Sequence, residues 1–135
     1  MANSLFDAGR ESFLAGNTDW DANNIKLVFI DHADDTPVPS TDDNLDDLTA
    51  PARVATSGNF GSKTTTAGVA DAADVTVTSV TGDPFESVVI YKDSGTEATS
   101  TLLVFIDTAT GLPLTPDGGN VTVQWDSGAN RIFKL

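Results

Sequence analysis

The feature that most constrains the fold is a set of three short segments that are apolar at every position. They are residues 27–30, 88–91 and 102–106. A strand with one face in water alternates apolar and polar residues, whereas a strand covered on both faces does not. We therefore expect three central strands with two covers. One cover is an opposing sheet, and we expect the other to be an N-terminal helix or a second subunit. The alternative is that the helix and loops alone cover that face.

Further candidate strands are separated by clusters of turn-forming residues such as Thr81-Gly82-Asp83-Pro84 and Asp126-Ser127-Gly128. Including the apolar segments, we expect strands near residues 25–30, 53–57, 60–66, 73–80, 86–92, 101–107, 120–125 and 130–134. Their spacing is typical of antiparallel sandwiches. The prediction is an all-β, jelly-roll-like antiparallel β-sandwich that forms one domain over residues 1–135.

The N-terminal segment has the periodicity of a short helix. Leu5, Phe6, Phe13 and Leu14 recur at helical spacing, and a glycine follows at position 16. We predict an amphipathic helix over residues 4–15. Its apolar stripe either packs across the end of a sheet, which we favour, or docks on a partner.

One short sequence occurs twice. Residues 27–31 and residues 103–107 are both Leu-Val-Phe-Ile-Asp. We interpret the two copies as central strands with the same packing requirement. A double Greek key would produce the same repeat.

The composition excludes several kinds of chemistry. The chain has no cysteine and a single histidine, His32, which we expect in a solvated loop. Cysteine nucleophiles, thiolate metal sites and histidine clusters are therefore excluded, and no nucleophile or phosphate-binding motif occurs. A net charge of −13 argues against nucleic acid as a partner. No segment has the length of a membrane span, and no signal-peptide pattern occurs at the N-terminus. We expect no enzymatic activity and no cofactor.

Aspartates form two clusters that offer oxygen ligands for calcium. The first contains Asp42, Asp43, Asp46 and Asp47, with Asp34 and Asp35 nearby in sequence. In this segment we predict a helical turn over residues 40–48 that Pro51 ends. The second contains Asp19, Asp21 and Asn23. The second cluster fails the spacing of a calcium-binding EF-hand loop, and we favour helix-start and solvated roles for the first. We therefore predict no metal site.

Three stretches of the chain together resemble small virion proteins of tailed bacteriophages. They are SLFDAGRESFLAGNTDWDANNIKLVFID; ARVATSG with AGVADAADVTVTSVTGD; and VVIYKDSGTEATSTLLVFIDTATGLPLTPDGGNVTVQWDSGANRIFKL. The resemblance implies a capsid decoration, or cement, protein that is made in the host cytoplasm and resides on the outside of the virion. It implies a dimer or trimer of this chain that binds the major capsid protein and stabilises its lattice.

We expect the contacts with partners to come from the helix, from the first tryptophan and from the C-terminal tail. The residues are Leu5, Phe6, Phe13, Trp20, Arg131, Phe133 and Leu135. For Trp20 and Trp125, packing in a core or interface is favoured over ligand stacking.

Two alternative functions stay open. One is a tail-associated or fibre-attachment, receptor-binding module that recognises a sugar through Trp20, Trp125 and calcium-binding aspartates. The other, less favoured, is a hydrolase with a pair of aspartates, because carboxylates are abundant.

Overall fold

The computed structural model describes residues 3–135, which are mostly β, with antiparallel sheets and one α-helix. The central sheet has five strands in the order β1-β7-β6-β2-β3, and every neighbouring pair is antiparallel. Its strands are β1 (Ser4–Leu5), β2 (Ile25–Ile30), β3 (Arg53–Thr56), β6 (Ser87–Lys92) and β7 (Leu102–Ile106). The three apolar segments form its centre, β7-β6-β2, as the sequence predicts.

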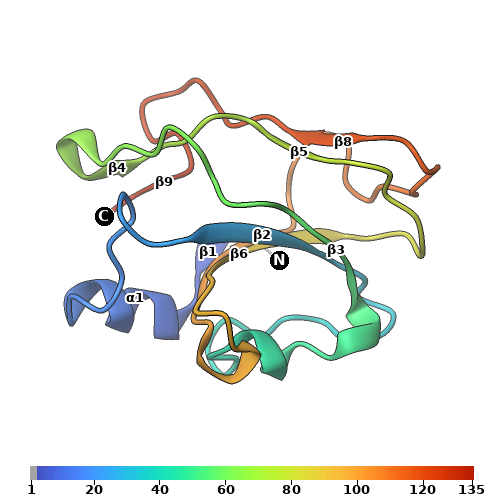
Figure 1. Ribbon diagram of the computed structural model, residues 1–135, viewed down its shortest axis with the longest axis horizontal. Helices are drawn as coiled ribbons and strands as arrows, with labels where there is room; N and C mark the ends of the chain where they lie inside the picture. Colours follow the sequence, from blue (N-terminus) through green and yellow to red (C-terminus); the bar gives the residue numbers. More distant parts are fainter. Residues whose placement is uncertain (1–2) are drawn as a thin grey trace.

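A second layer lies over one face of this sheet (Figure 1). It consists of two short antiparallel pairs, β4 (Val69–Ala70) with β9 (Phe133–Lys134) and β5 (Val75–Val77) with β8 (Val121–Val123). The alternation predicted here is observed, because Val75 and Val77 are buried while the hydroxyls of Thr76 and Thr122 face solvent 2.9 Å apart.

The larger core lies between the two layers. Phe29 from β2 and Phe85, which precedes β6, stack face to face with ring centroids 4.2 Å apart. Both rings are almost completely buried, as are Val88 and Val104. The same core includes Trp20, so the predicted packing role of this residue is confirmed.

The other face of the central sheet is covered by the chain itself. Phe6, Leu45, Leu48 and Ala52 pack on side chains of β2, β6 and β7 in a second core. Leu45 and Leu48 lie at the 3₁₀ turn η1 (Leu45–Asp47), and Ala52 lies in η2 (Ala50–Ala52). The doubly apolar strands therefore need no second subunit as cover, which removes the expectation of assembly that was based on them.

The N-terminal helix is shorter than predicted. Residues 4–5 form β1, and α1 spans Asp7–Leu14. Because Ser4 and Leu5 pair with β7, the chain is extended up to Phe6, whose ring lies in the second core instead of on an exposed stripe. The helix packs on β7, and Phe13 contacts Phe133 of β9 with ring centroids 5.6 Å apart.

Several predicted strands are also shorter or interrupted. Only isolated bridging at Thr64 occurs within residues 60–66, and β5, β8 and β9 cover part of their predicted ranges. Two further 3₁₀ turns are η3 (Thr66–Gly68) and η4 (Glu97–Thr99). Pro51 lies within η2 instead of only ending the predicted turn. Among residues 3–135, no helix is long and apolar enough to cross a membrane.

Candidate functional site

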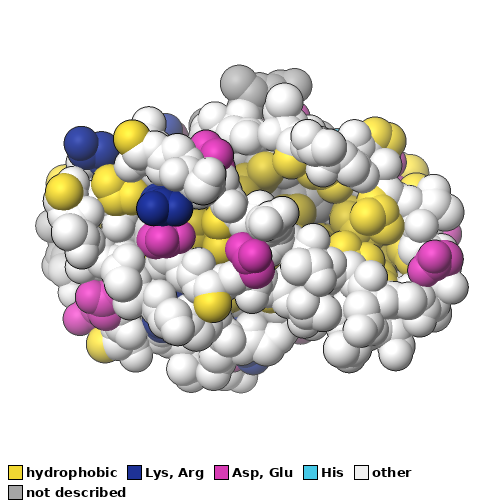
Figure 2. All heavy atoms as spheres, turned by 90° about the horizontal axis from the view of Figure 1, so that it is seen from above, with side chains coloured by type: hydrophobic (Ala, Val, Ile, Leu, Met, Phe, Trp, Pro, Cys, Tyr) yellow, Lys and Arg dark blue, Asp and Glu magenta, His cyan; other side chains and the backbone are white. Residues whose placement is uncertain are grey.

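A cleft of about 850 Å³, lined mostly by apolar residues, lies between the two layers. Its floor is the inner face of the central sheet, formed by Phe29, Phe85, Val88, Val104 and Ile106. Figure 2 shows hydrophobic side chains gathered in this hollowed face of the molecule. The volume is within the range of ligand-binding pockets.

The walls of the cleft come from segments far apart in the sequence. They are β1, the loop 108–112, residues 121–126 around β8, and residues 131–134 around β9. Leu112 and Leu114 of the loop after β7 add apolar surface that the sequence analysis missed. The only available signal was the presence of two leucines in a turn otherwise made of threonine, glycine and proline.

The ionisable residues along the cleft carry a net positive charge, unlike the chain as a whole. They are Asp126, Arg131 and Lys134, which give a local excess of positive charge in a protein of net charge −13. Arg131 approaches Asp71 at 3.8 Å, which is a loose ion pair. Within residues 3–135 no ion pair of Lys134 is found.

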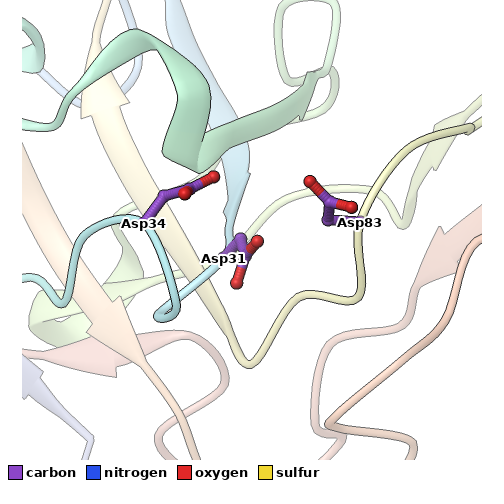
Figure 3. A group of neighbouring side chains, drawn as sticks. All are labelled: Asp31, Asp34 and Asp83. Carbon is purple, nitrogen blue, oxygen red and sulfur yellow. The ribbon is translucent and has the colours of Figure 1, made fainter.

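Three carboxylates that are not part of the cleft lining converge at the end of β2. Asp31, Asp34 and Asp83 each place an oxygen within 4.8 Å of the others. Figure 3 shows the carboxyl groups of Asp34 and Asp83 pointing toward each other, with Asp31 between them. Asp31 is buried, but one of its oxygens accepts a hydrogen bond from the Ala33 N–H at 2.8 Å.

Within residues 3–135 this trio is the group of acidic side chains close enough together to hold a metal ion, and oxygen ligands suit calcium. Sequence reasoning missed it because Asp83 comes from the loop before β6, far along the chain. A buried aspartate that orders its own loop through a backbone N–H has a structural role without a metal, however. The same loop is closed by hydrogen bonds from the Asp34 and Asp35 N–H groups to the Asp31 carbonyl.

Aspartates of the first predicted acidic cluster accept hydrogen bonds from backbone N–H groups. Asp42 accepts from Val38 N–H at 2.7 Å, and one Asp47 oxygen accepts from both Asp43 and Asn44 N–H. These two hydrogen bonds lower the pKa of Asp47. Burial raises the pKa of Asp42, against its backbone hydrogen bond. Asp47 therefore acts at the start of η1, a helix-start role of the kind favoured for this cluster.

The second predicted cluster is a closed loop. Asp19 accepts from the N–H groups of Asp21 and Ala22, and Asn23 accepts from Asp19 N–H. The Lys63 ammonium donates to the Asn23 carbonyl, and burial lowers the pKa of Lys63. The oxygens that calcium would need are thus engaged with backbone and side-chain donors.

His32 is not fully solvated, contrary to our expectation. Its Nε2 lies 2.8 Å from Ser87 Oγ, and its ring stacks on Phe105. A serine–histidine pair is the beginning of a nucleophilic site. Ser87 is completely buried, however, and Glu86 accepts from the His32 backbone N–H instead of orienting the ring. A substrate carbonyl has no access to this hydroxyl.

The predicted contact residues do not form one surface. Trp20 is buried and contacts Phe133 edge to face, with ring centroids 5.4 Å apart, so both belong to the aromatic group that includes Phe13. Phe6 is buried in the second core, which corrects its assignment to an exposed stripe. The remaining three are accessible: Leu5 and Arg131 line the cleft, and Leu135 is 64% exposed.

No protein-family model matches the chain, and no curated protein matches it significantly.

Proposed function

We propose that this protein acts by binding, as a capsid decoration protein on the outside of a bacteriophage head. The observation that carries a binding role is the open apolar cleft, which the fold leaves partly uncovered although both faces of its central sheet are filled. The resemblance of three long stretches to small virion proteins suggests the major capsid protein as the partner. The strongly acidic composition is compatible with an exterior position, away from packaged DNA.

Such a protein stabilises a shell through differential binding. If it binds the mature lattice more tightly than the immature one, its binding free energy is added to the closed form. We propose that the accessible C-terminal residue Leu135 and the cleft contribute the contacts, since Phe6 and Trp20 are buried within the protein.

The test is co-sedimentation of purified protein with empty heads, followed by calorimetry of the heads. We expect binding and a higher melting temperature of the shell. Leu135→Asp should weaken binding, whereas Leu14→Asp, at a helix position that is 91% exposed, is the matched control. Absence of both binding and thermal stabilisation would contradict the proposal.

The alternative is a tail-associated, receptor-binding module. Trp125, a partly buried ring in the cleft wall, favours it as a platform for a sugar, and the Asp31, Asp34 and Asp83 carboxylates offer a calcium site. Trp20 no longer belongs to this hypothesis, because it is buried. Glycan-array binding that EDTA abolishes, together with its loss in Asp83→Asn, would support the module over the decoration protein.

The predicted oligomer and sandwich are also proposals. A dimer or trimer now rests on the resemblance alone, and light scattering of the purified protein tests it. The five-stranded sheet facing two shorter sheets across one core supports a sandwich-like subunit. The jelly-roll arrangement is part of this proposal.

A further inference from the structure

One wall of the cleft is the edge of a strand. Six consecutive residues, 121–126, line the cleft. Successive side chains of a strand point to opposite faces, so a surface that contacts consecutive residues faces the backbone edge. The floor of the cleft is instead one face of a sheet, because β7 contributes the alternate residues Val104 and Ile106 but not Phe105 between them.

The free edge of β8 has unpaired backbone groups. Within residues 3–135, β5 is the only strand that pairs with β8. The Trp125 N–H donates to Asp74 Oδ1 at 3.1 Å, so it points to the side of the ribbon where β5 lies. Backbone groups alternate in direction along an antiparallel strand, which directs those of Thr122 and Gln124 away from β5 and toward the cleft.

The opposite wall has a similar edge. β1 is the end strand of the central sheet, and it pairs with β7 alone within the described part of the chain. Ser4 and Leu5 both line the cleft beside Asn3. The lining therefore includes two strands that lie at the ends of their sheets, β8 and β1, beside apolar residues of the central sheet. An extended chain matches this geometry, since its backbone satisfies the edges and its alternate side chains cover the floor.

We propose that the cleft binds an extended peptide segment of a partner protein, which adds as a strand to the free edge of β8. Apolar residues at alternate positions pack against Ile106, the residue of β7 in the lining that is only partly buried. An acidic residue of the segment lies near Lys134 and Arg131, the two cations of the lining. This inference holds for any partner and does not depend on a capsid role.

The proposal is tested first with a displayed library of random peptides of about twelve residues, a length that spans β8 and its flanks. We expect the enriched peptides to alternate apolar and other residues and to carry aspartate or glutamate toward one end. A synthetic copy of an enriched peptide should slow hydrogen exchange of the Thr122 and Gln124 amides, measured by NMR.

A pair of substitutions at one position isolates the strand edge. Gln124→Pro removes the outward N–H without removing a donor to β5, whereas Gln124→Ala keeps that N–H. We expect Gln124→Pro to weaken peptide binding by about tenfold or more and Gln124→Ala to leave it nearly unchanged. Should Gln124→Pro fail to fold, as judged by circular dichroism, amide protection in the wild-type protein decides the matter.

The charge of the segment is tested separately. Lys134→Glu should shift the selected peptides from acidic to basic ends. Arg10→Glu, an equal change of charge on α1 outside the cleft, should not.

Three results would overturn the proposal. They are a selection without enriched peptides, enriched peptides that leave the Thr122 and Gln124 amides unprotected, and a dimer of this chain that dissociates in Gln124→Pro. The last would assign the β8 edge to a second copy. Loss of capsid binding in the preceding experiment leaves this inference intact, because the peptide selection uses the isolated protein.

Discussion

Phe6 is a core residue, although its helical spacing with Phe13 suggested an exposed stripe. Its ring has no exposed surface and meets Phe105 edge to face, with centroids 6.3 Å apart. We expect Phe6→Ala to reduce the free energy of unfolding by about 3–5 kcal/mol, as for other buried phenylalanines. Urea denaturation measures this. Leu14→Ala is the control and should change stability by no more than about 0.5 kcal/mol. A small effect of Phe6→Ala would contradict the burial.

Tyr91 is the single tyrosine of the chain, so its ionisation is directly observable in the ultraviolet spectrum. Burial, followed by the nearby Asp93 carboxylate, raises the pKa of Tyr91 from 10.0 to about 12. We expect a spectrophotometric titration of the folded protein to show no phenolate at pH 10 and a midpoint near 12. A midpoint at the ordinary value would show that the hydroxyl is accessible to solvent.

The same shift of the Tyr91 pKa makes stability depend on pH. Because the folded pKa lies above the unfolded one, the contribution is complete below about pH 10 and is lost as pH rises toward 12. Tyr91→Phe should therefore lose less stability than the wild-type protein between these values.

Asp47 stabilises the turn η1 through two backbone N–H groups. We expect Asp47→Ala to cost about 1 kcal/mol at pH 7, typical of a lost cap. The hydrogen bonds hold the pKa of Asp47 below 3.8, so its contribution is present above that value and is lost as pH falls through the lower, folded pKa. The difference between the variant and the wild type should shrink below pH 4. Asp46→Ala, at an exposed neighbour, is the control.

At the scale of elements, α1 approaches β7 more closely than a side chain allows. A Cβ on Gly9 would lie 2.8 Å from the Leu102 carbonyl oxygen and from Leu103 Cα. Alanine favours a helix over glycine by about 1 kcal/mol, but this clash is with backbone that cannot move aside easily. We expect Gly9→Ala to destabilise the protein by about 1–3 kcal/mol in urea denaturation. Gly58→Ala, with open space around it, should be close to neutral. A more stable Gly9→Ala would show that the helix shifts freely.

The central strands were predictable because a strand buried on both faces is apolar at every position, which is visible in the sequence. β2 has the predicted bounds, β6 begins one residue later than predicted, and β7 is one residue shorter than predicted at each end. β4 and β9 were harder to predict, since pairs of two residues carry no periodicity. The two residues of β1 followed the helical pattern of their neighbours, yet they pair with β7. Tertiary pairing overrides local pattern there.

The repeated Leu-Val-Phe-Ile-Asp sequence illustrates a second limit. Both copies form strands beside β6, as interpreted, but Phe29 faces the larger core whereas Phe105 faces the second. Phe29 pairs with Val88 of β6 whereas Phe105 pairs with Val89, so the two copies pair with β6 in registers that differ by one residue. Equivalent residues therefore point to opposite faces, and the strands do not share one packing solution.

The cleft could not be predicted, because no single segment specifies it. Its walls meet only through the path of the chain, which returns residues 121–134 beside β1. Three of the seven predicted contact residues, Leu5, Arg131 and Phe133, do line it. The sequence indicated that apolar surface at both ends of the chain was available for binding, but not that the two ends form one hollow.

At the scale of the whole molecule, one segment both covers a core and concentrates charge. Residues 31–52 bring Leu45, Leu48 and Ala52 onto the central sheet. The same segment carries Asp31, Asp34, Asp35, Asp42, Asp43, Asp46 and Asp47. Its apolar residues therefore hold a dense set of like charges against the sheet, and the energy of that repulsion depends on screening.

We therefore expect salt to stabilise the protein. With 20 acidic and 7 basic residues, repulsion in the folded state exceeds the attraction of its few ion pairs. Raising NaCl from about 20 mM to about 500 mM should raise the melting temperature by several degrees, measured by calorimetry at pH 7. The double variant Asp34→Asn and Asp46→Asn removes two exposed charges and should melt higher at low salt with a weaker salt dependence. A melting temperature that falls with salt would show instead that attractive pairs dominate the electrostatics of this fold.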